Sequence, residues 1–211
     1  VRLSRELGES WELGMALALV GLMQVALGEA EVARRSLTEA LEIQEASGDR
    51  EGAGLSLGGL AALAEGDAAA ALYDAALEAF RDIGDRPEEA RILDARGWAA
   101  MTRSDFEAAR RDFAASLRAY EDVGSPRGVG LALLGLAAVE AAVNRPERAV
   151  RLSAAADSFR RAGGMVNDYA EGRPVASYLE AARASLDGPA LVRLEREGRA
   201  LSVREALDQA L

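Results

Sequence analysis

Acidic and basic side chains cluster in the stretch SDFEAARRDF, residues 104–113, where three acids and two arginines surround two phenylalanines. A pair of carboxylates can act as the acid and the base of a glycosidase when the two share a cleft. Nothing in the sequence marks two of these acids as sharing one. The alternative is one turn of a helical scaffold whose charges face water. Whether the stretch is catalytic or part of a scaffold depends on the secondary structure to which it belongs.

The composition removes most other catalytic chemistry. The chain has no histidine and no cysteine, so it lacks the commonest general base, the thiol nucleophile and the usual ligands of zinc, haem and iron–sulfur clusters. It also has no lysine, and therefore no phosphate-binding loop of the G-x-x-x-x-G-K-[ST] kind. The runs RPEEAR (86–91) and LEREGR (194–199) alternate charge at helical spacing and are interpreted as solvated faces. We predict that the protein is not an enzyme and uses no cofactor or metal.

Net charge and hydropathy narrow the possible partners. The formal net charge of −10 repels a phosphate backbone, so we predict no direct nucleic-acid binding by this segment. The apolar run GMALALVGLMQVALG (14–28) is interrupted and shorter than the roughly 20 residues of a membrane span, which predicts a buried helix, no membrane insertion and a cytoplasmic protein. The opening VRLSRELG is typical of the last turns of a helix, and we expect the natural protein to continue upstream.

Glycines recur along the chain at intervals of 36 to 40 residues. Alanine, leucine, glutamate and arginine dominate while aromatics make up 5%, a balance that predicts an all-α protein. A second break lies near the middle of each interval, so each unit is expected to contain two helices. The first set of breaks is Gly8, Gly48, Gly84, Gly124 and Gly163–Gly164, and the second is Gly28, Gly66, Ser104 and Asn144.

Start signals for helices agree with this period. Ser104 with Glu107, and Ser202 with Glu205, have the spacing of capping boxes, in which each residue bonds the other's backbone amide. Pro87, Pro126 and Pro146 fall in the first turns of expected helices, where a missing amide costs little.

The pattern resembles the tetratricopeptide repeat (TPR) family. That family's motif combines a glycine in the first helix, a glycine–acid turn, a small residue, a large apolar residue and an alanine. The clearest copies are Gly21, Gly28–Glu29, Ala33, Leu37 and Ala40, and then Gly97, Ser104–Asp105, Ala109, Phe113 and Ser116. The units are longer than usual for the family. The resemblance implies small residues where paired helices approach and large ones between units.

On this resemblance the fold is an all-α, right-handed α–α superhelix with a helical C-terminal cap. Residues 1–7 end a preceding repeat helix, residues 8–163 form four extended TPR-like repeats, and residues 164–211 form the cap. The four repeats are expected at 8–47, 48–83, 84–123 and 124–163.

The last third of the chain looks like the end of the repeat region in bacterial signalling ATPases and LuxR-type transcription regulators. The stretches that carry this likeness are NRPERAVRLSAAADSFRRAGG and LEAARASLDGPALVRLEREGRALSVREALDQAL. In that family an ATP-binding switch precedes the repeats and a helix-turn-helix often follows them. Any ATPase or DNA-binding activity would belong to such neighbouring domains.

The resemblance also implies which residues line the concave surface, because first helices of successive repeats do so in the family. The expected partner-binding residues are Leu22, Leu60, Arg91, Asp94, Trp98, Met101 and Leu134. Arg91, Asp94, Trp98 and Met101 share a helical face that joins an aromatic ring, a thioether and a potential ion pair, which is typical of a binding hot spot. The alternative is that Trp98 is core packing between repeats and that Arg91 and Asp94 are an intrahelical pair in water.

Two further aromatic groups have plainer interpretations. Trp11 is expected to pack against an upstream repeat. Tyr169, Arg173 and Tyr178 could line a pocket, but an end cap also needs large residues to seal it.

We therefore expect a protein-interaction or effector-sensing module of a larger bacterial transcriptional regulator. Its partner would be a protein or peptide, or a small-molecule effector, and a homo-oligomer is a further possibility. The alternative function is a passive scaffold or self-association module without a switching role.

Overall fold

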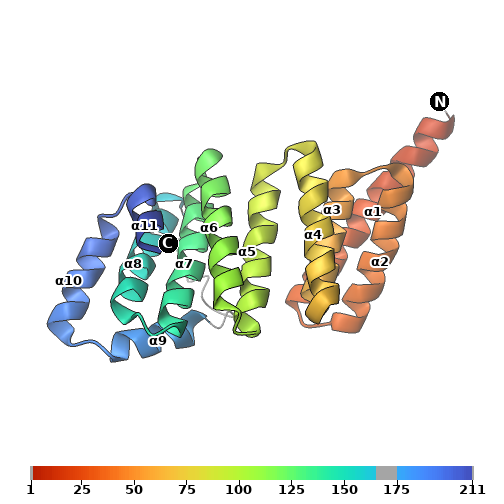
Figure 1. The fold of residues 1–211 in the computed structure, drawn as a ribbon. Helices are drawn as coiled ribbons and strands as arrows, with labels where there is room; N and C mark the ends of the chain where they lie inside the picture. Colours follow the sequence, from red (N-terminus) through yellow and green to blue (C-terminus); the bar gives the residue numbers. More distant parts are fainter. Residues whose placement is uncertain (1, 165–174, 211) are drawn as a thin grey trace. The chain divides into compact units, whose positions relative to one another are not determined.

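The structure is a computed structural model that describes residues 2–164 and 175–210, and every helix below lies in those ranges. The described residues form helices joined by short turns and contain no strand (Figure 1), which confirms the all-α prediction. The helices are α1 (Arg2–Ala26), α2 (Ala30–Ser47), α3 (Arg50–Ala62), α4 (Gly66–Ile83), α5 (Arg86–Thr102), α6 (Phe106–Asp122), α7 (Pro126–Ala142), α8 (Pro146–Ala162), α9 (Val175–Ala184), α10 (Gly188–Arg199) and α11 (Val203–Ala210).

The chain divides into two compact units, Val1–Ile92 and Leu93–Leu211, and the division falls within α5. In the first unit α1 packs against α2, α2 against α3, and α3 against α4. In the second unit α6 packs against α7, and α7 against α8. Each unit is described by itself below.

The helices end where the sequence predicts breaks. Gly48 and Gly84 have left-handed backbones, with φ of 73° and 71°, and Gly48 donates its amide to the carbonyls of Gln44 and Glu45 at the end of α2. Ser104 and Asn144 take the same left-handed conformation, each with φ of 59°, at the ends of α5 and α7. A side chain makes that conformation costly, so these two positions store strain that glycine would not.

One predicted capping box is wrong and the other is confirmed. Ser104 ends α5 in the left-handed region, so the next residue, Asp105, caps α6 by accepting from the Ala108 amide at 3.1 Å. Ser202 and Glu205 do form the reciprocal pair: the Ser202 amide donates to Glu205 Oε2 at 2.8 Å, and the Glu205 amide donates to Ser202 Oγ at 3.3 Å.

A large apolar side chain is held between two glycines in each unit. In the first, Leu37 on α2 lies so close to α1 and α3 that a Cβ at Gly21 or Gly59 would meet it at 2.6 Å or 2.8 Å. In the second, Phe113 on α6 lies against Gly97 on α5 and Gly135 on α7, where a Cβ would approach to 2.7 Å or 2.5 Å. Every member of the second trio follows its counterpart by the same interval along the chain.

Three shorter helices follow in the second unit. The α10 helix packs against α8, and α9 lies against α7 and α8. At Gly198 the backbone of α10 lies close to α8, because a Cβ there would stand 2.2 Å from the Arg151 carbonyl oxygen. Asp187 caps the start of α10, because its Oδ1 accepts from the Ala190 amide at 2.7 Å. Tyr169 and Arg173 of the predicted cap lie outside the described residues.

The prediction that residues 14–28 form a buried helix is wrong for one side of that helix. Residues 14–26 belong to α1, and Leu27 and Gly28 form the turn after it. Only one side of the helix is buried, at positions such as Gly14, Ala18 and Gly21. The other side exposes Leu19, Val20, Met23 and Leu27. Among the helices described, none is long and apolar enough to cross a membrane.

Candidate functional site

The residues expected to bind a partner are distributed over both units. In the first unit Leu60 is buried, while Leu22 and Arg91 are half-buried. In the second unit Asp94, Met101 and Leu134 are buried and Trp98 is half-buried. Leu60, Met101 and Leu134 thus serve the packing of their own units, and Trp98 is the member of the second group with a partly exposed apolar surface.

Trp98 is held in a defined orientation by its neighbour on α6. Its indole meets the fully buried ring of Phe113 edge to face, with centroids 5.2 Å apart and planes inclined by 67°. Such aromatic pairs add to the stability gained from area burial alone. A rigid indole with one side exposed can bind an apolar group without losing much side-chain entropy.

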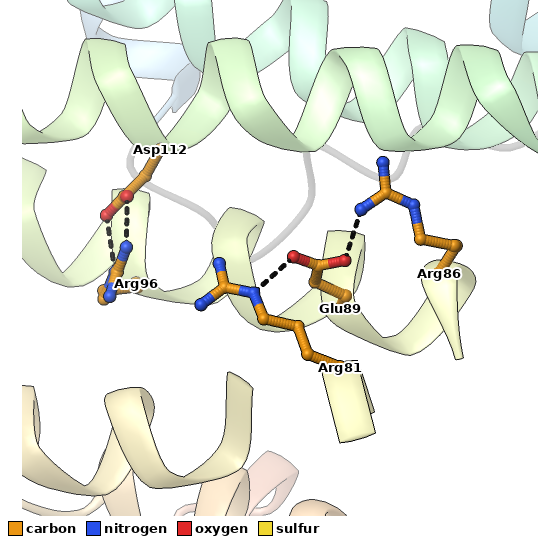
Figure 2. Close-up of polar contacts among 5 residues, drawn as sticks. All are labelled: Arg81, Arg86, Glu89, Arg96 and Asp112. Carbon is orange, nitrogen blue, oxygen red and sulfur yellow. Dashed lines mark hydrogen bonds and ion pairs between the residues drawn. The ribbon is translucent and has the colours of Figure 1, made fainter. Parts of the chain in front are cut away.

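Charged residues of α5 are also held by specific contacts, Arg91 in the first unit and Arg96 in the second. Arg91 Nε donates to Glu88 one turn earlier on α5, at 2.5 Å. Arg96 makes a two-point contact with Asp112 of α6, with Nε to Oδ2 at 2.9 Å and one terminal nitrogen to Oδ1 at 2.7 Å (Figure 2). Because Asp112 is buried, this fork of parallel hydrogen bonds fixes α6 against the second half of α5.

Glu89 forms a second polar network, in the first unit. Arg81 on α4 and Arg86 at the start of α5 each donate to one of its carboxylate oxygens, at 2.7 Å and 2.6 Å (Figure 2). The interpretation of RPEEAR as a solvated face is therefore wrong for Glu89, which is buried because its helix turns it toward α4.

Glu140 is a fully buried acid that the sequence analysis missed. Arg110 on α6 donates to its Oε1, and the side chains of Arg145 and Arg148 lie 3.6 Å and 3.7 Å from its Oε2. The interpretation of SDFEAARRDF as a scaffold whose charges face water is thus wrong for Arg110, whereas Arg111 is exposed. The available signal was one acid inside the apolar run VGLALLGLAAVEAAV.

An open pocket of about 390 Å³ lies in the first unit between α2, α3 and α4. Its lining includes the apolar residues Ala53, Leu57 and Ala79 and the charged residues Glu45, Asp49, Arg50 and Glu78. Asp49 Oδ1 caps α3 at the Gly52 amide, 3.0 Å away, while Oδ2 is buried without a hydrogen bond. Among the described residues no group of three or more acids is placed to hold a metal ion.

No family model, no curated protein and no solved structure matches this chain.

Proposed function

We propose that this chain is a TPR-like protein-interaction or effector-sensing module of a larger bacterial transcriptional regulator, working in the cytoplasm. In this proposal the helical hairpins belong to a right-handed superhelix, and a partner protein, a peptide or a small effector binds the face that carries Leu22, Leu60, Arg91, Asp94, Trp98, Met101 and Leu134. Leu37 and Phe113 each lie between two glycines of neighbouring helices, and this repeated packing arrangement supports a repeat architecture.

The half-buried indole of Trp98 is the observation that carries the binding role. Phe113 fixes its orientation, and Met101 follows on the same helical face. A partner that binds one arrangement of the hairpins more tightly than another shifts the population toward it, which is how a signal would reach neighbouring domains. Arg91 and Asp94 give the same face charges that would orient a polar end of the partner.

Photo-crosslinking from position 98 tests this proposal. A photoreactive phenylalanine replaces Trp98, crosslinked proteins are identified, and the partner is then purified and titrated by calorimetry. We expect Trp98→Ala to weaken binding by about 30-fold, the effect of an interface hot spot worth about 2 kcal/mol. Trp98→Phe keeps an aromatic ring against Phe113 and should weaken binding less.

Trp11→Ala is the matched control, because Trp11 is the other tryptophan of the chain and its side chain is exposed. Unchanged affinity for Trp98→Ala, or an equal loss for Trp11→Ala, would remove the support for a site at Trp98. A large drop in melting temperature with unchanged affinity would assign Trp98 to packing alone.

A passive scaffold or self-association module is the second candidate. The observation that favours it is the row of exposed apolar side chains along α1.

A further inference from the structure

A row of large apolar side chains is exposed in the first unit, along α1 and at Leu27, the residue that directly follows this helix. Leu27 is 71% exposed, Met23 66% and Leu19 52%, and Leu13 and Val20 are about half exposed. Water-soluble proteins rarely leave so continuous an apolar surface uncovered, and where they do it generally marks an interface.

The spacing of this row indicates which secondary structure would pack against it. Leu13, Ala16, Val20, Met23 and Leu27 follow one another at intervals of three and four residues, the pattern by which one helix packs along another in a coiled coil. We call these five residues the α1 seam. An extended peptide would match a repeat of two residues instead, so the seam fits a helix.

The seam points away from the helix that α1 already contacts. The opposite side of α1 carries Gly14 and Gly21, where a Cβ would meet Ile43 at 3.1 Å and Leu37 at 2.6 Å, both on α2. Among the described helices of the first unit, α1 packs against α2 and α3, and neither covers the seam.

Corresponding positions elsewhere in the chain show that this side of a first helix packs against other helices. The interval that relates Gly21 to Gly97 also relates Leu13 to Glu89 and Ala16 to Ile92, near the start of α5. Glu89 binds Arg81 of α4, and Ile92 lies 2.5 Å from where a Cβ at Gly58 of α3 would stand. In the first unit these two positions of α5 are covered by helices, whereas Leu13 and Ala16 of α1 are exposed.

We propose that the α1 seam docks a second copy of this chain, α1 against α1 in antiparallel orientation. In that orientation Ala16 of one copy faces Leu27 of the other and Val20 faces Met23, so small side chains meet large ones along the seam. The chain has a net charge of −10, and two copies repel unless their contact is free of acids. Between Leu13 and Ala26 the chain has no charged residue, and the exposed acids Glu12 and Glu29 lie just beyond the two ends of the seam.

Sedimentation equilibrium of the whole chain tests the pairing, which is independent of the partner site proposed at Trp98. We expect a reversible dimer in the micromolar range that dissociates in the double variant Val20→Glu, Met23→Glu. Both residues are exposed, so the variant should keep the helical circular dichroism and melting temperature of the wild-type monomer. Val192→Glu on α10 is the matched control, because Val192 is 69% exposed and lies in the other unit, and it should remain dimeric. A wild-type chain that stays monomeric throughout this range would overturn the proposal and assign the seam to a helix of another protein.

Disulfide crosslinking tests the orientation without background, because the chain contains no cysteine. A disulfide forms only when the two Cα atoms come within about 7 Å. Mixing Val20→Cys with Met23→Cys should give the mixed crosslink faster than either variant crosslinks with itself. Faster self-crosslinking of both variants would indicate parallel pairing, and absence of any crosslink would contradict docking of a second copy. Either result leaves the proposed site at Trp98 untouched.

Discussion

Arg81 at the end of α4 donates its Nε hydrogen to the carboxylate of Glu89 on α5 at 2.7 Å, although Glu89 is only 5% exposed. Burial raises the pKa of Glu89, but the hydrogen bonds and positive charges of Arg81 and Arg86 lower it by more. The net result is a pKa below the ordinary value of a glutamate. The ion pair therefore makes the stability of the first unit depend on pH.

We predict that Glu89 stabilises the fold at neutral pH and that this contribution is lost in acid. A lowered folded-state pKa gives stability that is complete above the pKa of the unfolded chain and disappears as the pH falls through the lower, folded-state value. Glu89→Gln should therefore melt below wild type at neutral pH, with the difference shrinking as the pH is lowered. Thermal melts over a pH series measure it. Glu42→Gln, at an exposed position of α2, is the control and should follow wild type. A constant difference between Glu89→Gln and wild type across the series would contradict the prediction.

A second prediction concerns Arg110 and the buried carboxylate of Glu140. Arg110→Ala would leave Glu140 with only the longer contacts to Arg145 and Arg148, at 3.6 Å and 3.7 Å. Removing one partner of a buried ion pair costs about 3 kcal/mol or more, because the remaining charge is uncompensated. Urea denaturation should show that loss. Arg145→Ala is the control and should cost less, since its side chain is 53% exposed and lies 3.6 Å from Glu140 Oε2, while Arg110 keeps its hydrogen bond to the same carboxylate.

The double variant Arg110→Leu, Glu140→Leu separates a lost ion pair from lost packing. Replacing both charges with apolar side chains should recover most of the stability that Arg110→Ala loses, because no buried charge remains. If the double variant is as unstable as the single one, the carboxylate of Glu140 is not the cause.

Local signals in the sequence predicted the helices, whereas contacts between distant residues were missed. Gly28, Gly48, Gly84 and Gly124 end helices because each takes a left-handed backbone, a property of the residue and its neighbours. The partner of Glu140 lies 30 residues away, and helical periodicity does not show which arginine of α6 turns toward α7. The apolar residues of α1 correctly predicted a helix. Its burial could not be predicted, because it depends on what packs against the side of α1 that faces away from α2. Only some of the predicted binding residues reach the surface, because Leu60, Met101 and Leu134 are buried in the packing between helices.

Gly97 should not tolerate alanine. A Cβ there would stand 2.7 Å from Phe113, whose ring is fully buried and has little room to move. Overpacking of this kind costs about 1–3 kcal/mol. Gly188→Ala is the matched control: its Cβ would meet nothing within 4 Å, and alanine is the better helix former, so stability should stay the same or rise. Urea denaturation of both variants measures the contrast. Equal stability of the two variants would show that Phe113 shifts freely.

The last prediction tests which residue caps α6. Asp105→Ala removes the carboxylate that accepts from the Ala108 amide, and should cost about 1 kcal/mol. Ser104→Ala should change the free energy of unfolding by only a few tenths of a kcal/mol, because both side chains suffer equally in the left-handed region and Ser104 gives no cap there. Ser125→Ala is the positive control, since Ser125 Oγ accepts from the Gly128 amide at 3.2 Å at the start of α7. Denaturant titrations of the three variants decide the matter: a loss of about 1 kcal/mol for Ser104→Ala, with none for Asp105→Ala, would restore the capping box that the sequence favours and refute the cap in the structure.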